Sequence, residues 1–373
     1  MNETLSFPFL RNRSFYSEEV RTLADRKSKD AVAHRLNSLY MDRGLNSCIL
    51  LANFIFKTAK QLTLFKEYLR IVDVTSFELI IRKKLPGGEL VRLTKELEKT
   101  IEDLKGLATK SSENAKEHIF QYTLDNPTKR AFRIRFDKSE KNFFLGLYKL
   151  SLLNPLALGK PDRDFYKNAE FNDRLLVRPP DVSDANAIFF VRNMTLQIEK
   201  PKKSIPYSSI SDGEHQFIQV FGTALLFDEP GNLFLFDEPE SHFNPYWRAR
   251  FAAILNSIQS TTRQQFVVST HSPYLISGCH SKNVFKFKRD GDSVSVTCVK
   301  DELETFGASF EFILKQLFEL KVAISEEALS KMKDALRSTD VESVRETLSG
   351  LGESYERRFV LEHLLALDKG IEK

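Results

Sequence analysis

Cysteine is scarce in this sequence, and so is tryptophan. The 373 residues include three cysteines, Cys48, Cys279 and Cys298, and a single tryptophan. The cysteines show no paired spacing, which excludes a disulfide framework or a cysteine-based zinc site and indicates reduced thiols. A signal peptide and any apolar run long enough to cross a bilayer are missing too. We therefore expect a soluble, cytoplasmic protein with no membrane partner.

A strong excess of one charge is also missing. The sequence has 55 Lys and Arg against 51 Asp and Glu, a net charge of +4. So small an excess does not by itself indicate nucleic-acid binding. The basic clusters at residues 82–84 and 200–203 are more typical of solvated loops than of a DNA groove. The length suffices for one large domain or two ordinary ones.

The most informative segment is an apolar run that ends in two acidic residues. Residues 233–236 are apolar and lie between a Gly-Asn turn and a proline, with Asp237 and Glu238 just before that proline. The run predicts a parallel strand that is covered on both faces. Asp237 and Glu238 then lie at the carboxyl edge of the sheet, where α/β folds bind ligands. A nucleotide hydrolase needs one carboxylate there to hold Mg²⁺ through water and another to orient and deprotonate the attacking water.

The same Asp-Glu-Pro triplet also occurs at residues 228–230. Apolar residues at helical spacing precede this copy: Phe217, Val220, Phe221, Ala224 and Leu225. They predict that the first copy only continues a helix, which Pro230 and Gly231 end. Asp228 and Glu229 are therefore interpreted as solvated turn residues, and the second copy as the site.

Two polar clusters flank the acidic pair along the chain. Ser211-Asp-Gly-Glu214 opens an amphipathic helix upstream, and a second apolar strand downstream ends in a cluster around His271. Ser211 and Glu214 alone are typical of an ordinary helix capping box. The free N–H groups at such a helix start also suit contact with phosphate. The order and spacing of the three segments favour a nucleotide site over three unrelated structural features.

In these segments the chain resembles the ATPase heads of the ABC superfamily, over about residues 205–300. The resemblance implies that Ser211, Asp212, Gly213 and Glu214 are the signature motif, which contacts nucleotide. It also implies that Asp237 is the Walker B residue that holds Mg²⁺ through water, and that Glu238 and His271 are the catalytic base and the switch histidine. Glu240, Ser241, His242 and Asn244 resemble the D-loop at a dimer interface.

Departures from the transporter pattern point to one branch of this superfamily. Transporter ATPases usually carry Gly-Gly-Gln and a threonine after the Walker B proline, whereas this chain has Gly213-Glu214 and Glu240. The chain is thus similar to the soluble SMC-like and overcoming-lysogenization-defect (OLD) branch. Residues 5–9 and 46–53 are similar to restriction-associated and anti-phage ATPases, including Septu and retron-linked ones.

The phosphate-binding loop of such ATPases, Gly-x-x-x-x-Gly-Lys-Ser/Thr, does not occur in this sequence. The nearest candidates, Gly87-Gly88 and Gly159-Lys160, lack its spacing or its ending, and Pro161 breaks any helix that follows. We therefore expect the chain to hold the second half of a nucleotide site, completed by a P-loop-bearing upstream segment or chain. A non-hydrolysing, nucleotide-sensing scaffold that docks a nuclease is the alternative.

The predicted fold is α/β, an ABC-type ATPase head with a parallel sheet, helices and an antiparallel lobe, followed by a helical tail. Residues 1–200 are expected to form the antiparallel lobe with a helical insert, 201–302 the ATPase core, and 303–373 the helical region. Strands are predicted at 76–82 and 187–198, a helix at 89–107, and hairpins at 117–137 and around Asp290-Gly291.

The resemblance implies ATP and Mg²⁺ as cofactors, ATP hydrolysis as the activity, and a head-to-tail homodimer. No acidic strand ends for a metal-dependent nuclease follow residue 303, so a nuclease or another effector is expected as a partner. The predicted function is an ATPase subunit that drives or gates a DNA-acting defence complex, with DNA, RNA and protein all open as its target.

Overall fold

The computed structural model describes residues 43–159, 161, 182–258, 264–291, 293–320 and 324–369. Residues 5–9, compared above with anti-phage ATPases, lie outside this part. The described residues up to Leu275 form one compact unit, and those from Ile276 onward form another. This division differs from the boundaries expected after residues 200 and 302. One hydrophobic core runs from Leu45 to Leu275 and joins the antiparallel lobe to the segments around the acidic pair.

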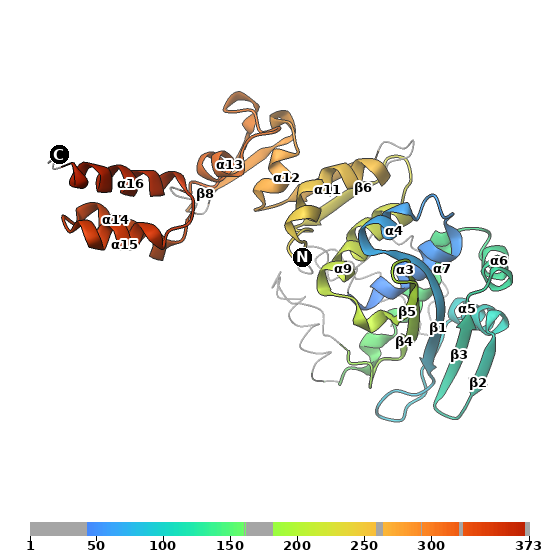
Figure 1. Ribbon diagram of the computed structural model, residues 1–373. Coiled ribbons are helices and arrows are strands. Elements are labelled where there is room, and N and C mark those ends of the chain that lie inside the picture. Colours follow the sequence, from blue (N-terminus) through green and yellow to red (C-terminus); the bar gives the residue numbers. More distant parts are fainter. Residues whose placement is uncertain are drawn as a thin grey trace. The chain divides into compact units, whose positions relative to one another are not determined.

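A five-stranded antiparallel sheet makes up much of the first unit (Figure 1). Its strands are β1 (Ile71–Arg82), β2 (Lys110–Glu113), β3 (Glu117–Thr123), β4 (Phe189–Ile198) and β5 (Lys203–Pro206), in the order β2-β3-β1-β4-β5. The central strand β1 pairs with β3 from Ser76↔Thr123 to Arg82↔Glu117. The strands predicted at 76–82 and 187–198 are confirmed as parts of β1 and β4. The prediction succeeded because alternate side chains of each strand pack into the core.

Helices α3 (Asn46–Phe56), α5 (Lys95–Leu107) and α7 (Glu140–Ser151) pack on strands of this sheet, and α4 (Thr63–Leu69) precedes β1. Helix α3 is almost wholly buried. Helix α5 begins after Thr94, whose side chain accepts a hydrogen bond from the Leu97 N–H, so it starts later than the predicted Glu89.

The hairpin predicted for residues 117–137 is wrong. Strand β3 pairs with β1 and β2, and the following residues form helix α6 (Asn126–Arg135). The Asp125 side chain accepts a hydrogen bond from the Thr128 N–H, and Pro127 lies in the first turn. Both features favour a helix start, and they outweigh the short apolar alternation that suggested a strand.

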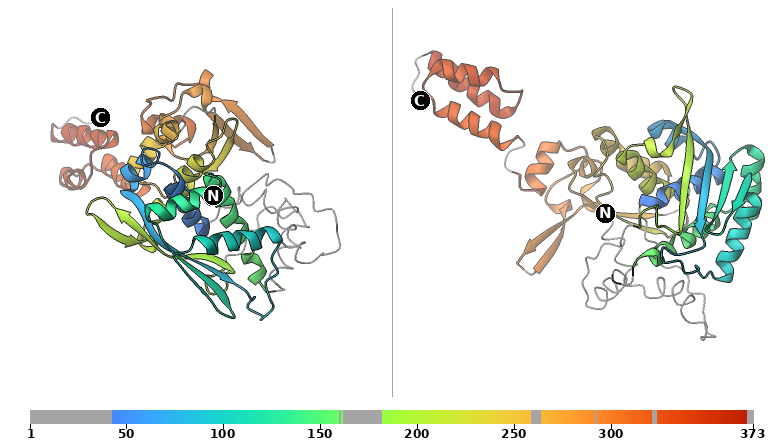
Figure 2. Two further views of the ribbon diagram at one scale, coloured as in Figure 1. Left: turned by 90° about the vertical axis from the view of Figure 1, so that its right-hand side faces the viewer. Right: turned by 90° about the horizontal axis from the view of Figure 1, so that it is seen from below.

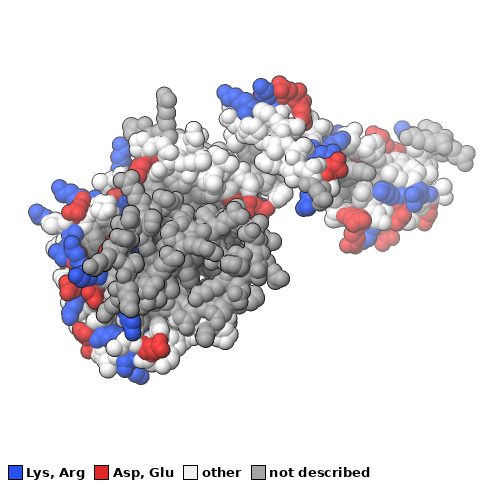
Figure 3. All heavy atoms as spheres, turned by 180° about the vertical axis from the view of Figure 1, so that it is seen from behind, with Lys and Arg blue, Asp and Glu red and all other residues white. Residues whose placement is uncertain are grey.

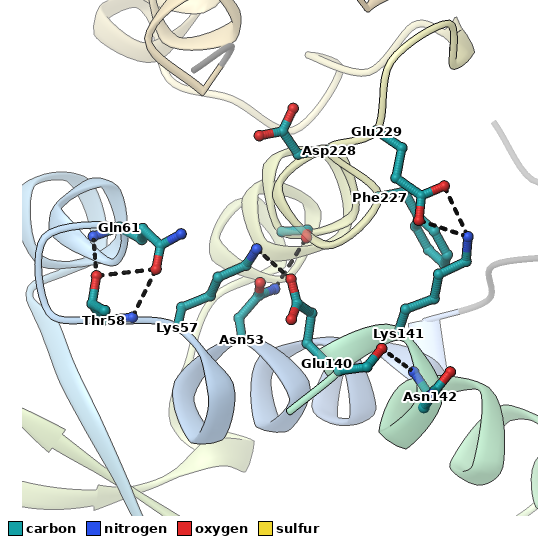
Figure 4. A network of polar contacts seen from close by, with 12 residues as sticks. Asn53, Lys57, Thr58, Gln61, Glu140, Lys141, Asn142, Phe227, Asp228 and Glu229 are labelled. Carbon is teal, nitrogen blue, oxygen red and sulfur yellow. Dashed lines mark hydrogen bonds and ion pairs between the residues drawn. The ribbon is translucent and has the colours of Figure 1, made fainter. Parts of the chain in front are cut away.

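A polar network joins α3 and α7 to the end of a third helical segment (Figure 4). Lys57 forms an ion pair with Glu140, and the buried Asn53 side chain donates to the Gly222 carbonyl oxygen at 3.0 Å. The first Asp-Glu-Pro copy lies here, after helix α10 (Thr223–Leu226) has ended. The helix thus ends before Asp228, rather than at Pro230 and Gly231 as predicted. Glu229 is exposed and pairs with Lys141 at 2.9 Å, so this copy has a structural partner of its own.

The described residues of the second unit form a hairpin, four α-helices and two short 3-10 helices. Strands β8 (Phe285–Asp290) and β9 (Ser293–Cys298) pair antiparallel, as predicted, and are followed by α13 (Phe310–Leu317). Helices α14 (Glu326–Arg337), α15 (Val341–Ser349) and α16 (Tyr355–Asp368) pack together around Val344 and Val360 (Figure 2). The helical tail is thereby confirmed, and the fold is α/β with a helical C-terminal region.

Two surface properties follow from the described residues. Their helices include none that is both long and apolar enough to cross a membrane. On the face drawn in Figure 3, basic and acidic side chains are interspersed over the described surface rather than gathered by sign. This distribution agrees with the small net charge of +4.

Candidate functional site

Two parallel strands carry the acidic pair. Strand β6 (Leu233–Asp237) pairs with β7 (Gln265–Ser269), in a register that runs from Leu233↔Gln265 to Asp237↔Ser269. The prediction of a parallel strand ending in the two carboxylates is confirmed. Since parallel strands end at the same edge, the residues that follow β6 and β7 share one edge of the sheet.

The prediction that β6 is covered on both faces is wrong. Phe234 and Phe266 stack with their ring centroids 5.1 Å apart and pack against the core. On the other face, Leu233, Leu235 and Val267 are 55%, 57% and 56% exposed. Parallel sheets normally bury both faces. We call Leu233, Leu235 and Val267 the bare face of the β6–β7 sheet.

The acidic pair is held by the end of β7. The Ser269 hydroxyl donates to Asp237 Oδ1. Glu238 has φ +42°, in the left-handed region that residues with side chains rarely adopt, and its N–H donates to the Ser269 carbonyl oxygen at 3.0 Å. Glu238 Oε1 lies 3.4 Å from His271 Nε2, and the two side chains are 47% and 82% exposed. The carboxylate and the imidazole are thus adjacent and open to solvent.

The residues after the acidic pair form a turn with one buried carboxyl. Glu240 is 3% exposed and accepts a hydrogen bond from the Thr270 hydroxyl. Burial raises the pKa of the Glu240 carboxyl above its ordinary range, and the Thr270 hydrogen bond opposes this effect. Ser241, His242 and Asn244 are exposed, as a docking surface requires. Asn244 Oδ1 also accepts from the Trp247 N–H at 2.9 Å, at the start of α11 (Pro245–Ile258).

The signature residues adjoin this turn. Helix α9 (Asp212–Phe217) begins with the predicted capping box, in which the Ser211 N–H donates to Glu214 Oε2 at 2.6 Å. Gln216 Nε2 donates to the Pro239 carbonyl oxygen at 2.7 Å, and Gly213 packs against the main chain of His242. Ser211 and Asp212 are exposed. The predicted site residues therefore lie in two adjoining groups within the first unit.

Two further residues belong to the site, Ser269 and Thr270. Each donates a side-chain hydrogen bond to an acidic residue after β6. Their signal in the sequence was their position, since both follow the apolar run of β7 just as the carboxylates follow β6. Register between the strands, which the sequence does not reveal, decided which carboxylate each hydroxyl meets.

The donor set suits a metal that is shared with a nucleotide. Among the described residues, no three His, Cys, Asp or Glu side chains gather as a protein-only metal site. Magnesium in nucleotide sites is bound by one or two protein groups together with phosphates and water. Asp237, oriented by Ser269, fits that kind of site.

A parallel strand pair that ends in Asp-Glu beside a histidine has the arrangement expected of a nucleotide hydrolase of the P-loop ATPase class. Residues 81–277 match the family described as "AAA domain, putative AbiEii toxin, Type IV TA system". The match covers more than half of the chain, and the chain belongs to this AAA family. Such domains bind and hydrolyse nucleotides, generally ATP with Mg²⁺.

Two relatives share part of the sequence. Protein ea59 of Escherichia phage lambda is 27% identical over 110 residues, which are 29% of this chain and 21% of that protein. An uncharacterized protein of Methanocaldococcus jannaschii is 24% identical over 133 residues, which are 36% of this chain and 16% of that protein. The chain thus matches only a small part of either relative.

Proposed function

We propose that this chain is an ATP-hydrolysing subunit that supplies the acidic pair, the switch histidine and the signature residues of an ATP site. A P-loop-bearing segment or chain completes the site. The observation that carries the proposal is the parallel pair β6–β7, which brings Asp237, Glu238 and His271 to one edge, with Glu238 3.4 Å from His271.

Each group at this edge has a role that its surroundings support. Asp237 would hold Mg²⁺ through water, and the Ser269 hydroxyl orients the Asp237 carboxylate. Glu238 is half exposed and is hydrogen-bonded to β7 through its N–H; its carboxylate orients the attacking water and accepts a proton from it. His271 adjoins that carboxylate. Bound Mg-ATP would supply the reacting phosphate, and its Mg²⁺ would supply positive charge that offsets the negative charge of the phosphate oxygens.

The exposed residues define the proposed subunit contact. Ser211, Asp212, Ser241 and His242 lie on adjoining exposed segments, joined where Gly213 meets His242. In a head-to-tail homodimer this surface meets nucleotide that the other subunit binds, with Ser211 and Gly213 toward the phosphate. Glu240, Ser241, His242 and Asn244 then form the D-loop at the interface, with the Glu240 side chain buried beneath it. Two copies then make two sites.

The exposed apolar residues of the bare face support the proposal that another segment completes the β6–β7 sheet. Among the described residues, β6 and β7 form a sheet of two strands. A further strand paired with either of them, followed by a helix over Leu233, Leu235 and Val267, would bury apolar surface that is half exposed. In parallel α/β sheets the loop between such a strand and helix emerges at the carboxyl edge. That is the edge of Asp237 and Glu238.

We further propose that this ATPase drives or gates a DNA-acting defence complex, like the SMC-like, OLD, Septu and retron-linked ATPases that the sequence resembles. Ser211–Glu214 and Glu240 support that branch. A nuclease or another effector is the partner, and the cytoplasm the location. The alternative is a nucleotide-sensing scaffold without turnover, against which the contact between Glu238 and His271 argues.

Turnover of Mg-ATP tests the proposal. The full chain is assayed alone and with a strand–P-loop–helix segment, fused upstream or added separately. We expect weak binding by the chain alone, and binding and turnover once the segment is present. Glu238→Gln keeps the size of the side chain but cannot take a proton, so turnover should fall by about 100-fold or more while an ATP-bound dimer accumulates.

The first Asp-Glu-Pro copy provides a matched control. Glu229→Gln changes the same residue type in the same triplet, and in the described part of the chain Glu229 forms its ion pair with the half-buried Lys141. Its turnover should equal that of the unchanged protein. Wild-type turnover in Glu238→Gln contradicts the assignment of Glu238 as the catalytic base. Micromolar binding of Mg-ATP by the chain alone contradicts the proposal that the chain holds only half of the site. Binding of ATP without turnover in the completed assembly favours the non-hydrolysing scaffold.

A further inference from the structure

Glu240 is the most deeply buried acidic side chain near the acidic pair, and it contacts the strand end that carries the switch histidine. It is 3% exposed, and its Oε1 accepts the hydrogen bond of the Thr270 hydroxyl. Its Oε2 is buried and has no hydrogen-bond partner among the described residues. A buried carboxyl costs free energy unless its contacts offset the loss of water, so the Thr270 contact should be strongly preferred.

Thr270 passes this restraint to the backbone on both sides of His271. Its Oγ1 donates to Glu240 and at the same time accepts the Ser272 N–H at 2.9 Å. Thr270 is therefore hydrogen-bonded to Glu240 directly, and Ser272 is linked to Glu240 through the Thr270 hydroxyl. The His271 side chain lies between these two residues and is 82% exposed.

We propose that Glu240 is a positioning residue, which acts through Thr270 to hold the His271 imidazole beside the Glu238 carboxylate. The inference rests on the proposed function for its meaning in catalysis, but the contact itself needs no nucleotide. Burial raises the pKa of the Glu240 carboxyl, and the Thr270 hydrogen bond opposes this rise.

The contact is tested first without nucleotide, by NMR of the histidine rings of the full chain. His271→Asn assigns the His271 signals. In the wild-type background, Glu238→Gln should shift them, because the two side chains lie 3.4 Å apart. Valine has the same shape as threonine but no hydroxyl. In the Thr270→Val background, Glu238→Gln should therefore no longer shift the His271 signals; we call this shift the response. Thr270→Ser restores the hydroxyl and should restore the response.

Two variants distinguish positioning from folding. Glu240→Ala should also abolish the response, and Glu240→Gln, which keeps an oxygen for Thr270 to donate to, should retain part of it. Circular dichroism and thermal unfolding check that each variant is folded. If a folded Thr270→Val responds to Glu238→Gln as the wild type does, the proposal is overturned.

The second readout is turnover in the completed assembly. Thr270→Val should lower kcat by about 10- to 100-fold, with KM changed by less than about threefold, and Thr270→Ser should recover most of kcat. If Glu238→Gln stops turnover but Thr270→Val leaves kcat unchanged, this inference fails and the proposed function stands. If no assembly turns over ATP, the proposed function fails, and the NMR experiment alone decides the contact.

Discussion

Gly213 lies directly against the main chain of His242: a Cβ atom on Gly213 would be 2.7 Å from the His242 carbonyl oxygen. Together with the hydrogen bond from Gln216 to the Pro239 carbonyl oxygen at 2.7 Å, this contact joins the signature residues to the turn after the acidic pair. The signature residues and this turn are therefore in direct contact within one chain. In the head-to-tail dimer that we propose, the same contact would lie between the two ATP sites.

Gly213→Ala should destabilise the first unit. The added methyl group meets backbone rather than a flexible side chain, so either α9 or the turn must move, at a cost of about 1–3 kcal/mol. The matched control is Gly106→Ala in α5, where a Cβ atom has no other atom within 4 Å and alanine should stabilise by about 0.5–1 kcal/mol. Urea unfolding measures both variants. Equal stability changes contradict the close approach.

Ser211→Arg should block ATP-driven dimerisation without unfolding the chain. Ser211 is exposed, so arginine finds room, and the lost cap costs only about 1 kcal/mol. At a subunit contact the long side chain keeps the heads apart. Light scattering with ATP measures dimerisation, on the chain completed by the strand–P-loop–helix segment and in the Glu238→Gln background. Ser343→Arg on the exposed surface of α15 adds the same charge and should dimerise normally. An unchanged dimer in Ser211→Arg refutes the signature assignment.

Leu235→Asp tests the bare face. Leu235 is 57% exposed, so the stability of the chain should change by about 1 kcal/mol or less. Affinity for the strand–P-loop–helix segment should fall by about tenfold or more, because a carboxylate would be buried there. Calorimetry measures the affinity. Leu90→Asp, at a leucine that is 68% exposed and lies outside the β6–β7 sheet, should bind normally. Equal affinities of the two variants contradict this docking site.

Glu304 should stabilise the second unit by an amount that is lost in acid. The backbone N–H groups of Phe306 and Ser281 donate to its carboxylate and lower the pKa of Glu304 from 4.5 to about 2. A depressed folded pKa stabilises the fold above the unfolded value, and this stabilisation is lost as the pH falls from 4.5 to about 2. The difference in urea-unfolding free energy between wild type and Glu304→Gln should therefore shrink over that range. A difference that is constant from about pH 6 to pH 2 contradicts it.

Local sequence patterns predicted many of the elements and the order of the motifs. Strands β4, β6 and β7, the hairpin around Gly291 and the capping box at Ser211 all follow from side-chain period and turn residues. These signals are local, because each depends on residues within a few positions of one another. The helix at residues 126–135 was missed although Asp125 and Pro127 carried a local signal for it, which the apolar alternation outweighed.

Contacts between distant segments decided the rest. An apolar run looks the same whether one or both of its faces are covered, so the exposure of Leu233 and Leu235 became visible only in the folded chain. The burial of Glu240, its bond to Thr270 and the approach of Gly213 to His242 each join residues about 30 positions apart. Residue types and their spacing identify the candidate catalytic residues, because both can be recognised within a short segment of the sequence. Which carboxyl is buried, and which stays open to solvent, depends on strand register and on packing from other elements.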